Sequence, residues 1–463
     1  MLKTSDVVFR LRNSAVVWSW AMNGLRLTSG VVILPLLIHK LAKPDYDMYF
    51  VLLSITALIP ILDMGFAVNI GRAVSYATGG AGQLQIQGLP LPTASGGPNF
   101  PMLWRLLHTT RRLYAGLALA VLLLVGLGGT FFIKNAVPQT TTPWLTWAAW
   151  GVTLVAITWE IYSGRWSVFL RNMNRVLPSA QLAVLAQAVK IVLSCVLLMS
   201  GAGLLSVPLA GIFASFLQRA LAQRLVLRLL DRKADQGITQ DEVKATLRTL
   251  WPNTWRIGIH FLSSYLAGQA NTLICLPLLG LAASGQYGFS LQMIALCLGM
   301  AQVWTFVKWP QVEQLRVKQD LVGLRRLLWF RLWAQNLTYI GLVIAVIIIV
   351  PFLLRWLNSD KTMLPAIWLC FMALNGLFDL HCNFWNTLIA TENRLPMVWP
   401  MLIGNVCSFL TIVILSQTTD LGLASFVIVP LIVGSMFNYW KWPRYGARTL
   451  GTSWVRFLFT RPQ

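Results

Sequence analysis

The chain has little charge, and acidic residues are especially scarce. Only 11% of its 463 residues are charged and only 15 are Asp or Glu, whereas 56% are hydrophobic. A soluble domain carries roughly 25% charged residues. The composition therefore excludes a soluble globular enzyme, a disordered protein and a secreted disulfide scaffold. A polytopic membrane protein remains.

Several features of catalysis and cofactor binding are also missing. The six cysteines lie in or beside apolar stretches, and none has the spacing of a metal site. No Gly-Lys-Ser/Thr phosphate-binding loop is present, so we expect no ATP-driven step in this chain. The connections expected outside the cell are too short for a large catalytic domain. We therefore expect no cofactor, no metal ion and no enzymatic activity.

Long apolar stretches recur along the whole chain. A helix needs about 20 mostly apolar residues to cross a bilayer. The stretches are continuously apolar and do not alternate, which excludes a closed β-barrel. The sequence predicts an all-α polytopic membrane protein with twelve spans, at 14–38, 46–70, 112–134, 143–163, 180–201, 203–224, 256–280, 284–308, 329–355, 363–390, 395–416 and 419–440.

Basic residues are distributed unevenly between the two sides of these spans. One set of connections, which includes both termini, holds 30 of the 37 Lys and Arg residues; the opposite set holds five, and Arg26 and Lys190 lie inside spans. Cytoplasmic loops carry an excess of Lys and Arg. We therefore expect both termini in the cytoplasm. The net charge of +22 then faces anionic lipid, and it does not indicate nucleic-acid binding.

The spans divide into two lobes. The predicted domains are an N-terminal six-helix lobe at 1–224, a cytoplasmic linker at 225–255 and a C-terminal lobe with a tail at 256–463. The linker has mixed charge and is typical of a solvated amphipathic helix. A Gly/Pro-rich inner loop at 77–101 is predicted to be irregular.

The two lobes share short sequence words in the same order. Residues 166–178 read WSVFLRNMNRVLP and residues 385–396 read WNTLIATENRLP, with an acid six residues before each Trp, at Glu160 and Asp379. Leu34-Pro35-Leu36-Leu37 likewise resembles Leu276-Pro277-Leu278-Leu279. Corresponding spans have the same orientation, which predicts a parallel pseudo-two-fold repeat. Such repeats are typical of carriers that transport by alternating access.

These words also carry a family resemblance. The stretch from Leu34-Pro35-Leu36-Leu37 through Tyr46 to Leu62-Asp63-Met64-Gly65 resembles the first two spans of bacterial polysaccharide exporters. So do Gln286-Tyr287-Gly288, Lys308-Trp309-Pro310 and the Asn393-Arg394 turn. These exporters are the O-antigen and lipid-linked oligosaccharide flippases of the multidrug/oligosaccharidyl-lipid/polysaccharide exporter superfamily. The resemblance implies a bacterial inner membrane as the location and an undecaprenyl-pyrophosphate-linked oligosaccharide as cargo. It also implies a role in the biosynthesis of lipopolysaccharide, as O-antigen, of exopolysaccharide or of another surface polysaccharide. A polysaccharide polymerase and chain-length proteins are then possible partners.

Ionisable residues inside a membrane are costly and mark candidate sites. Arg26 and Lys190 lie near the middle of their spans, where two cations suit an anionic cargo, and Asn23 and Asn271 are candidate sugar contacts. The alternative for Arg26 is a structural pair with Asp63. For Lys190 it is snorkelling or a carbonyl contact.

A second group of residues is predicted near the inner ends of spans. Glu160 and Asp379 are candidate gate residues, or simple partners of Arg165 and Arg394; Asp63 belongs to this gate or coupling set as well. His260 and His381 could carry protons, although histidines near helix ends are more often satisfied interfacial groups.

Two transport functions and one enzymatic function compete at this stage. The positive charges at Arg26 and Lys190 favour a flippase over a cation-coupled multidrug exporter, in which mid-membrane carboxylates are expected. A membrane-embedded polymerase or acyltransferase is less favoured, because the outer loops are short and lack a catalytic cluster.

Overall fold

The structure is a computed structural model in which part of the chain is described. The described residues are 15–81, 97–235, 237–306, 308–309, 312, 315, 320–356, 359–390 and 396–460. Most of the Gly/Pro-rich loop 77–101 and the Asn393-Arg394 turn lie outside them. The side chains of Asn23, Arg26 and His260 also lie outside the description, although their backbones are helical.

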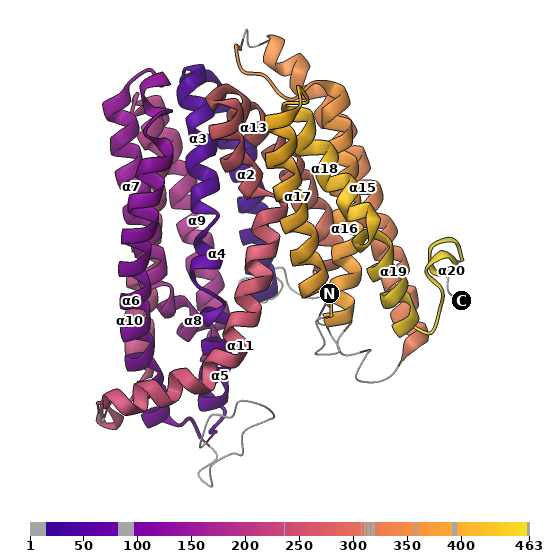
Figure 1. Cartoon of the computed structure of the whole chain (residues 1–463). Coiled ribbons are helices and arrows are strands. Elements are labelled where there is room, and N and C mark those ends of the chain that lie inside the picture. Colours follow the sequence, from indigo (N-terminus) through magenta and orange to yellow (C-terminus); the bar gives the residue numbers. More distant parts are fainter. Residues whose placement is uncertain are drawn as a thin grey trace, which may run out of the picture. The chain divides into compact units, whose positions relative to one another are not determined.

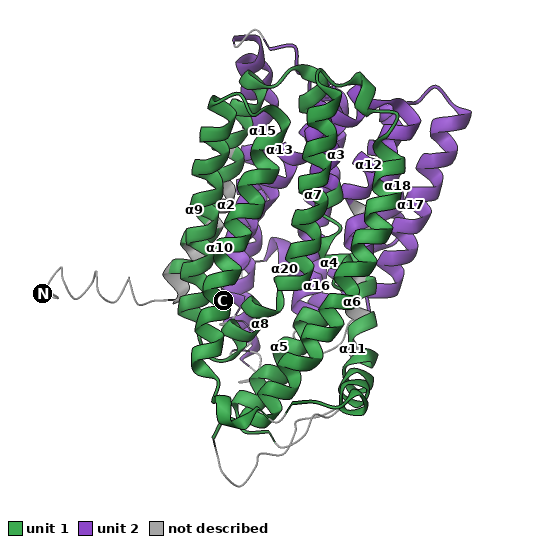
Figure 2. Ribbon diagram, turned by 90° about the vertical axis from the view of Figure 1, so that its left-hand side faces the viewer, with its two compact units in different colours: residues 1–46, 55–261 green, residues 47–54, 262–463 purple. Residues whose placement is uncertain are grey.

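The described residues form helices and no β-strand (Figure 1). The chain divides into two compact units, coloured separately in Figure 2. Unit 1 comprises residues 1–46 and 55–261, and unit 2 comprises residues 47–54 and 262–463. Part of the second predicted span is therefore grouped with unit 2, and the predicted linker 225–255 belongs to unit 1.

Unit 1 contains six predicted spans and their connections. Its helices are α2 (Ala15–Lys40), α3 (Lys43–Thr56, of which residues 47–54 belong to unit 2), α4 (Ile59–Leu62), α5 (Phe66–Thr78), α6 (Phe100–Ile133), α7 (Pro143–Ser163), α8 (Arg165–Asn172), α9 (Val176–Met199), α10 (Ser206–Leu229) and most of α11 (Gln240–Ala267). Helix α7 begins at Pro143, as predicted, whereas α6 begins at Phe100, twelve residues before the predicted span 112–134. The Asn99 side chain caps α6 by accepting from the Met102 N–H at 3.0 Å.

Unit 2 holds the remaining spans. Its helices are α12 (Gln269–Leu279), α13 (Leu281–Phe306), α15 (Leu321–Trp356), α16 (Ala366–Ala390), α17 (Val398–Thr418), α18 (Leu423–Met436), α19 (Asn438–Thr449) and α20 (Trp454–Phe459). Part of its core is aromatic: Trp385 is fully buried and packs edge-on against Phe384 and Phe457. This cluster fixes the end of α16 against α19 and α20.

The predicted fold class is confirmed. Among the described residues, nine helices are long and apolar enough to cross a membrane. The other three predicted spans correspond to α2, α7 and α12. Three spans are broken: 46–70 at Met64 and Gly65, which have φ of 53° and 81°, 256–280 at Gly268, and 419–440 at Phe437. Large apolar side chains such as Leu127 remain 73% exposed, as expected of a lipid-facing surface.

Each unit repeats the same order of helix neighbours. In unit 1, α9 packs on α10, α6 on α7, α2 on α9 and α7 on α10. In unit 2 the corresponding contacts are α17 on α18, α15 on α16, α12 on α17 and α16 on α18. The same four neighbour relations thus recur six predicted spans further along the chain. This recurrence is what an internal six-plus-six repeat requires.

Candidate functional site

Asp63 lies at the break in the second predicted span. Its Oδ2 accepts a hydrogen bond from the Ala67 N–H at 2.9 Å, so the carboxylate caps the start of α5. Its Oδ1 accepts from the Tyr114 hydroxyl of α6 at 2.8 Å. The salt bridges among the described residues do not include Asp63. The predicted pair with Arg26 lies outside the described side chains.

Glu160 is the centre of a second polar cluster in unit 1. The Arg219 guanidinium of α10 forms a salt bridge with Glu160 Oε1 and also donates to Ser167. The Ser215 hydroxyl donates to Glu160 Oε2 at 2.5 Å. Because Ser215 and Arg219 are four residues apart, they lie on one face of α10. Glu160 thus links α7 to α10.

The sequence suggested a different arginine for Glu160, and that suggestion is wrong. Arg165 instead donates to the backbone carbonyl of Tyr162 and stacks over the rings of Tyr162 and Trp166. Gly164, between α7 and α8, keeps right-handed helical angles (φ −52°, ψ −33°), so Arg165 lies on the same helix face as Tyr162, three positions earlier. The neighbouring residue in sequence is therefore not the partner in space.

Asp379 occupies the middle of α16, and its partners are neutral. Its Oδ1 lies 2.9 Å from the Tyr439 hydroxyl, and its Oδ2 accepts from the Asn375 amide at 3.2 Å. The Tyr439 hydroxyl also lies 2.8 Å from Asn375 Oδ1. A hydroxyl group donates its one proton to one acceptor at a time, so the Tyr439 hydroxyl can donate either to Asp379 or to Asn375. No salt bridge among the described residues involves Asp379.

The predicted depth of Asp379 is also wrong. The residue lies eleven positions before Ala390, the last residue of α16, which is about 17 Å at 1.5 Å per residue. In the first copy of the repeat the helix breaks after Ser163, only three positions beyond Glu160. In the second copy α16 is unbroken, so Asp379 lies near mid-span. Its suggested partner Arg394 lies outside the described residues.

His381 is held by two tryptophans. The indole N–H groups of Trp385 and Trp454 both lie 3.1 Å from its Nε2. An atom that accepts two hydrogen bonds carries no proton, so the network assigns a neutral ring protonated at Nδ1. His381 therefore links α16 to α20.

The predicted cargo contacts are located in different environments. Asn271 is buried, and its amide donates to the Tyr287 hydroxyl at 3.3 Å, within unit 2. Lys190 is half-buried on α9. The Cε atom of Lys190 lies 3.9 Å from the position that a Cβ would occupy at Gly211 of α10. Asn271 thus contributes to helix packing, and the stem of Lys190 lies along α10.

Sequence reasoning missed Tyr114, Tyr439 and Arg219. The position of a tyrosine in the sequence does not indicate which side chain its hydroxyl contacts in the fold. The four-residue spacing of Ser215 and Arg219 places two polar side chains on one face of an otherwise apolar stretch, which indicates a polar partner for Arg219. Among the described residues, no group of three or more His, Cys, Asp or Glu side chains is placed to hold a metal ion.

Comparison with known proteins identifies the fold but not the family. No family model and no curated protein matches the chain. Solved structures do match. An inward-facing multidrug resistance MATE family transporter of the MOP superfamily aligns over 94% of this chain and 98% of its own, with a TM-score of 0.65 and 12% identity.

Two further solved structures have the same fold as this chain. An outward-facing MATE transporter of the same superfamily aligns over 96% of this chain and 97% of its own, with a TM-score of 0.53 and 12% identity. The MATE multidrug transporter DinF-BH, solved as a complex, aligns over 92% and 93% with a TM-score of 0.59 and 12% identity. The chain is a multi-pass membrane protein with the fold of MATE transporters.

Proposed function

We propose that this protein is a cation-coupled secondary exporter that works by alternating access. The observation that carries the proposal is Asp379: a carboxylate near the middle of a membrane-spanning helix, hydrogen-bonded only to neutral groups among the described residues. Ionisable groups at that depth are costly and mark ion and proton pathways. The same fold occurs in transporters solved in inward-facing and outward-facing conformations, which supports alternating access.

A carboxylate with neutral partners suits reversible cation binding. It can exchange a proton or a small cation without breaking a salt bridge, whereas Glu160 is already neutralised by Arg219. The Tyr439 hydroxyl can donate to ionised Asp379 and to Asn375 when Asp379 is protonated. Occupancy of Asp379 would then change the hydrogen bonds between α16 and α19.

The test is accumulation of a cationic dye in bacteria that lack their main exporters. Cells that express the protein should accumulate less dye than cells with an empty vector, and Asp379→Asn should abolish the difference at equal protein abundance. Thr387→Ala is a matched control, because Thr387 is a half-buried residue of the same helix whose hydroxyl donates to the Asn383 carbonyl. Unchanged export by Asp379→Asn would contradict the coupling role.

A second candidate is a flippase for a lipid-linked, undecaprenyl-pyrophosphate oligosaccharide. It is favoured by Arg26 and Lys190, which lie on the neighbouring helices α2 and α9. Arg binds pyrophosphate in a fork geometry and Lys binds it as a point charge. Arg26→Ala should then leave the lipid-linked precursor on the inner leaflet. Normal polymer export by that variant would exclude Arg26 as a cargo contact.

A further inference from the structure

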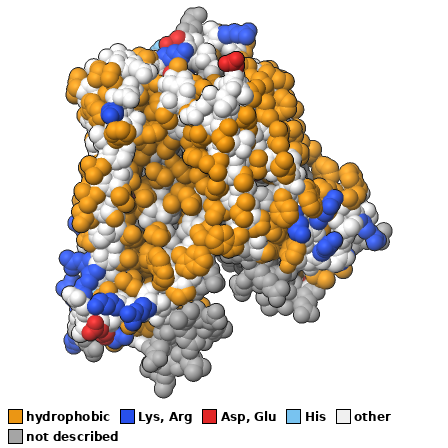
Figure 3. Space-filling view, viewed as in Figure 1, with side chains coloured by type: hydrophobic (Ala, Val, Ile, Leu, Met, Phe, Trp, Pro, Cys, Tyr) orange, Lys and Arg blue, Asp and Glu red, His pale blue; other side chains and the backbone are white. Residues whose placement is uncertain are grey.

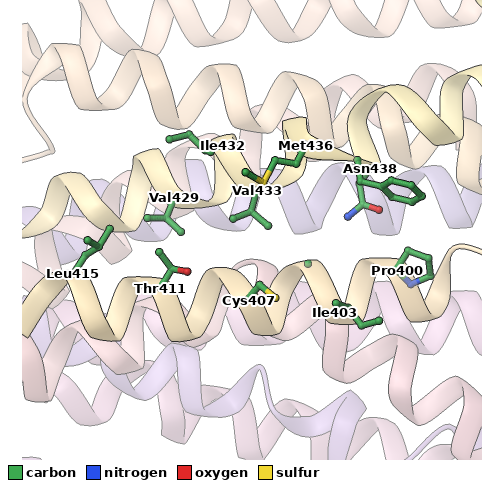
Figure 4. A pocket seen from close by; sticks show the side chains of 12 residues that line it. Pro400, Ile403, Cys407, Thr411, Leu415, Val429, Ile432, Val433, Met436 and Asn438 are labelled. Carbon is green, nitrogen blue, oxygen red and sulfur yellow. The ribbon is translucent and has the colours of Figure 1, made fainter.

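An apolar groove runs between α17 and α18, entirely within unit 2. It has a volume of about 630 Å³. Figure 4 shows Cys407, Thr411 and Leu415 along α17 facing Val429 and Val433 along α18. From Pro400 to Leu415 the groove follows fifteen positions of α17, or about 22 Å at 1.5 Å per residue. The groove is long and narrow, and most of its lining is carbon.

The surroundings of the groove are apolar as well. Both helices belong to segments that are long and apolar enough to cross a membrane. Several of its lining side chains are themselves exposed hydrophobics, among them Ile403, Ile432 and Met436. Hydrophobic side chains cover the face that α17 and α18 present in Figure 3. An exposed apolar groove at this depth meets hydrocarbon rather than water.

One end of the groove is basic and aromatic. Phe437 lines the groove, and Lys441 Nζ lies 5.8 Å from the centre of its ring. One turn further along α19, the Arg444 guanidinium lies 5.0 Å from the centre of the Trp440 ring. Lys441 and Arg444 are exposed, and the salt bridges among the described residues include neither. Two positive charges therefore lie at one end of the apolar groove.

This basic end is at the predicted cytoplasmic surface. Residues 441–456 belong to the set of connections that holds most Lys and Arg residues. Aromatic and basic side chains together are typical of the headgroup level of a membrane. The apolar part of the groove then extends from the headgroup level toward the opposite side of the membrane.

We propose that the groove binds one anionic phospholipid of the inner leaflet. An acyl chain lies between α17 and α18, and the headgroup phosphate contacts Lys441 and Arg444. The apolar lining matches the acyl chain. Lys441 and Arg444, which form no salt bridge within the described part of the chain, match a lipid of net negative charge. A zwitterionic lipid offers no net charge to them. The proposal requires that α17 and α18 cross a membrane, and it does not depend on which cargo is transported.

The test is native mass spectrometry of the full-length protein, purified in mild detergent and titrated with phosphatidylglycerol or phosphatidylethanolamine. Wild type should retain one phosphatidylglycerol in preference to phosphatidylethanolamine. Lys441→Gln and Arg444→Gln should each weaken retention about fivefold, because a basic residue near an anionic surface contributes about 1 kcal/mol. Cys407→Phe should abolish retention by filling the groove.

Matched controls separate this site from general lipid binding. Val406→Phe adds the same aromatic side chain at an exposed position of α17 outside the lining, and Arg456→Gln removes an exposed charge on α20. Both should retain phosphatidylglycerol as wild type does, and all variants should elute as wild type from a sizing column. Equal binding of the two lipids, retention by Cys407→Phe, or specific retention of a polyprenyl phosphate instead would overturn the proposal.

Discussion

The Tyr439 hydroxyl lies 2.9 Å from the Asp379 carboxylate and 2.8 Å from the side-chain oxygen of Asn375, so one proton joins α19 to two acceptors on α16. This arrangement stabilises α16 against α19 in two alternative ways. We expect the choice between them to depend on the charge of Asp379, because an ionised carboxylate is the stronger acceptor. The link between α16 and α19 is therefore the part of unit 2 that we expect to respond to a bound cation.

Tyr439→Phe should reduce transport while the protein still folds. The variant keeps the ring that packs against Phe378 but removes the donor to Asp379. Hydrogen bonds to charged groups contribute about 1.5–3 kcal/mol, so we expect about tenfold or greater loss of transport rate. Dye efflux from cells measures it. A wild-type rate would show that the hydroxyl has no part in coupling.

The Glu160–Arg219 pair should be structural. Arg219 and Glu160 side chains are 11% and 29% exposed, so Arg219→Met leaves a mostly buried carboxylate without its partner and should cost about 1–3 kcal/mol. Glu160→Gln combined with Arg219→Met should recover part of that loss. Thermal unfolding in detergent measures both.

The exposed Lys244–Asp241 pair is the control for this comparison. Its side chains are 67% and 95% exposed, and such pairs contribute about 0–1 kcal/mol. Lys244→Met should therefore leave the unfolding temperature nearly unchanged. If Arg219→Met were equally harmless, Glu160 would be free to act in gating.

The start of α11 should weaken in acid. Thr239 and Glu242 form a capping box, with Glu242 Oε2 accepting from the Thr239 N–H at 3.0 Å, and these hydrogen bonds lower the pKa of Glu242. A group whose pKa is lower when folded stabilises the fold above its unfolded pKa, about 4.3. That contribution is lost as the pH falls through the folded value.

Hydrogen exchange of the first turn of α11 measures this effect. Protection should be constant from pH 7 to about pH 5 and should decrease below about pH 4. Glu242→Gln should lower protection above about pH 5 and remove the acid-dependent step, because the variant has no carboxyl group to titrate. A step of the same size in Glu242→Gln would assign it to another group.

The predicted topology has its own test. Reporter fusions after residues 41, 137 and 359 should report the outside of the cell, and fusions after residues 172, 235 and 320 the inside. The reason is the distribution of Lys and Arg over the connections. Reversal at two of these sites would contradict both the orientation and the repeat derived from it.

Much of the fold could be predicted from the sequence because hydrophobic length and charge asymmetry are local signals. The twelve apolar stretches and the paired words around Trp166 and Trp385 need no tertiary information. The site could not be predicted in the same way. Glu160 contacts Arg219, 59 positions away, and Asp379 contacts Tyr439, 60 positions away. Only the packing of α7 on α10 and of α16 on α19 brings these pairs together.

The breaks within spans also escaped prediction. Met64 has a positive φ without being a glycine, and its turn is stabilised by the Asp63 cap on α5. Residue patterns alone placed Asp63 inside a continuous span. The tertiary contact with Tyr114 is what stabilises the interruption.

The most direct test of the central claim is dye transport by purified protein in liposomes with an imposed proton or sodium gradient. We predict that a gradient of one of these cations drives accumulation of a cationic dye against the dye's own gradient. Asp379→Asn should abolish this uphill transport, and Thr387→Ala should not. Dye movement that is independent of both gradients, or uphill transport that persists in Asp379→Asn, would contradict a cation-coupled exporter that uses Asp379.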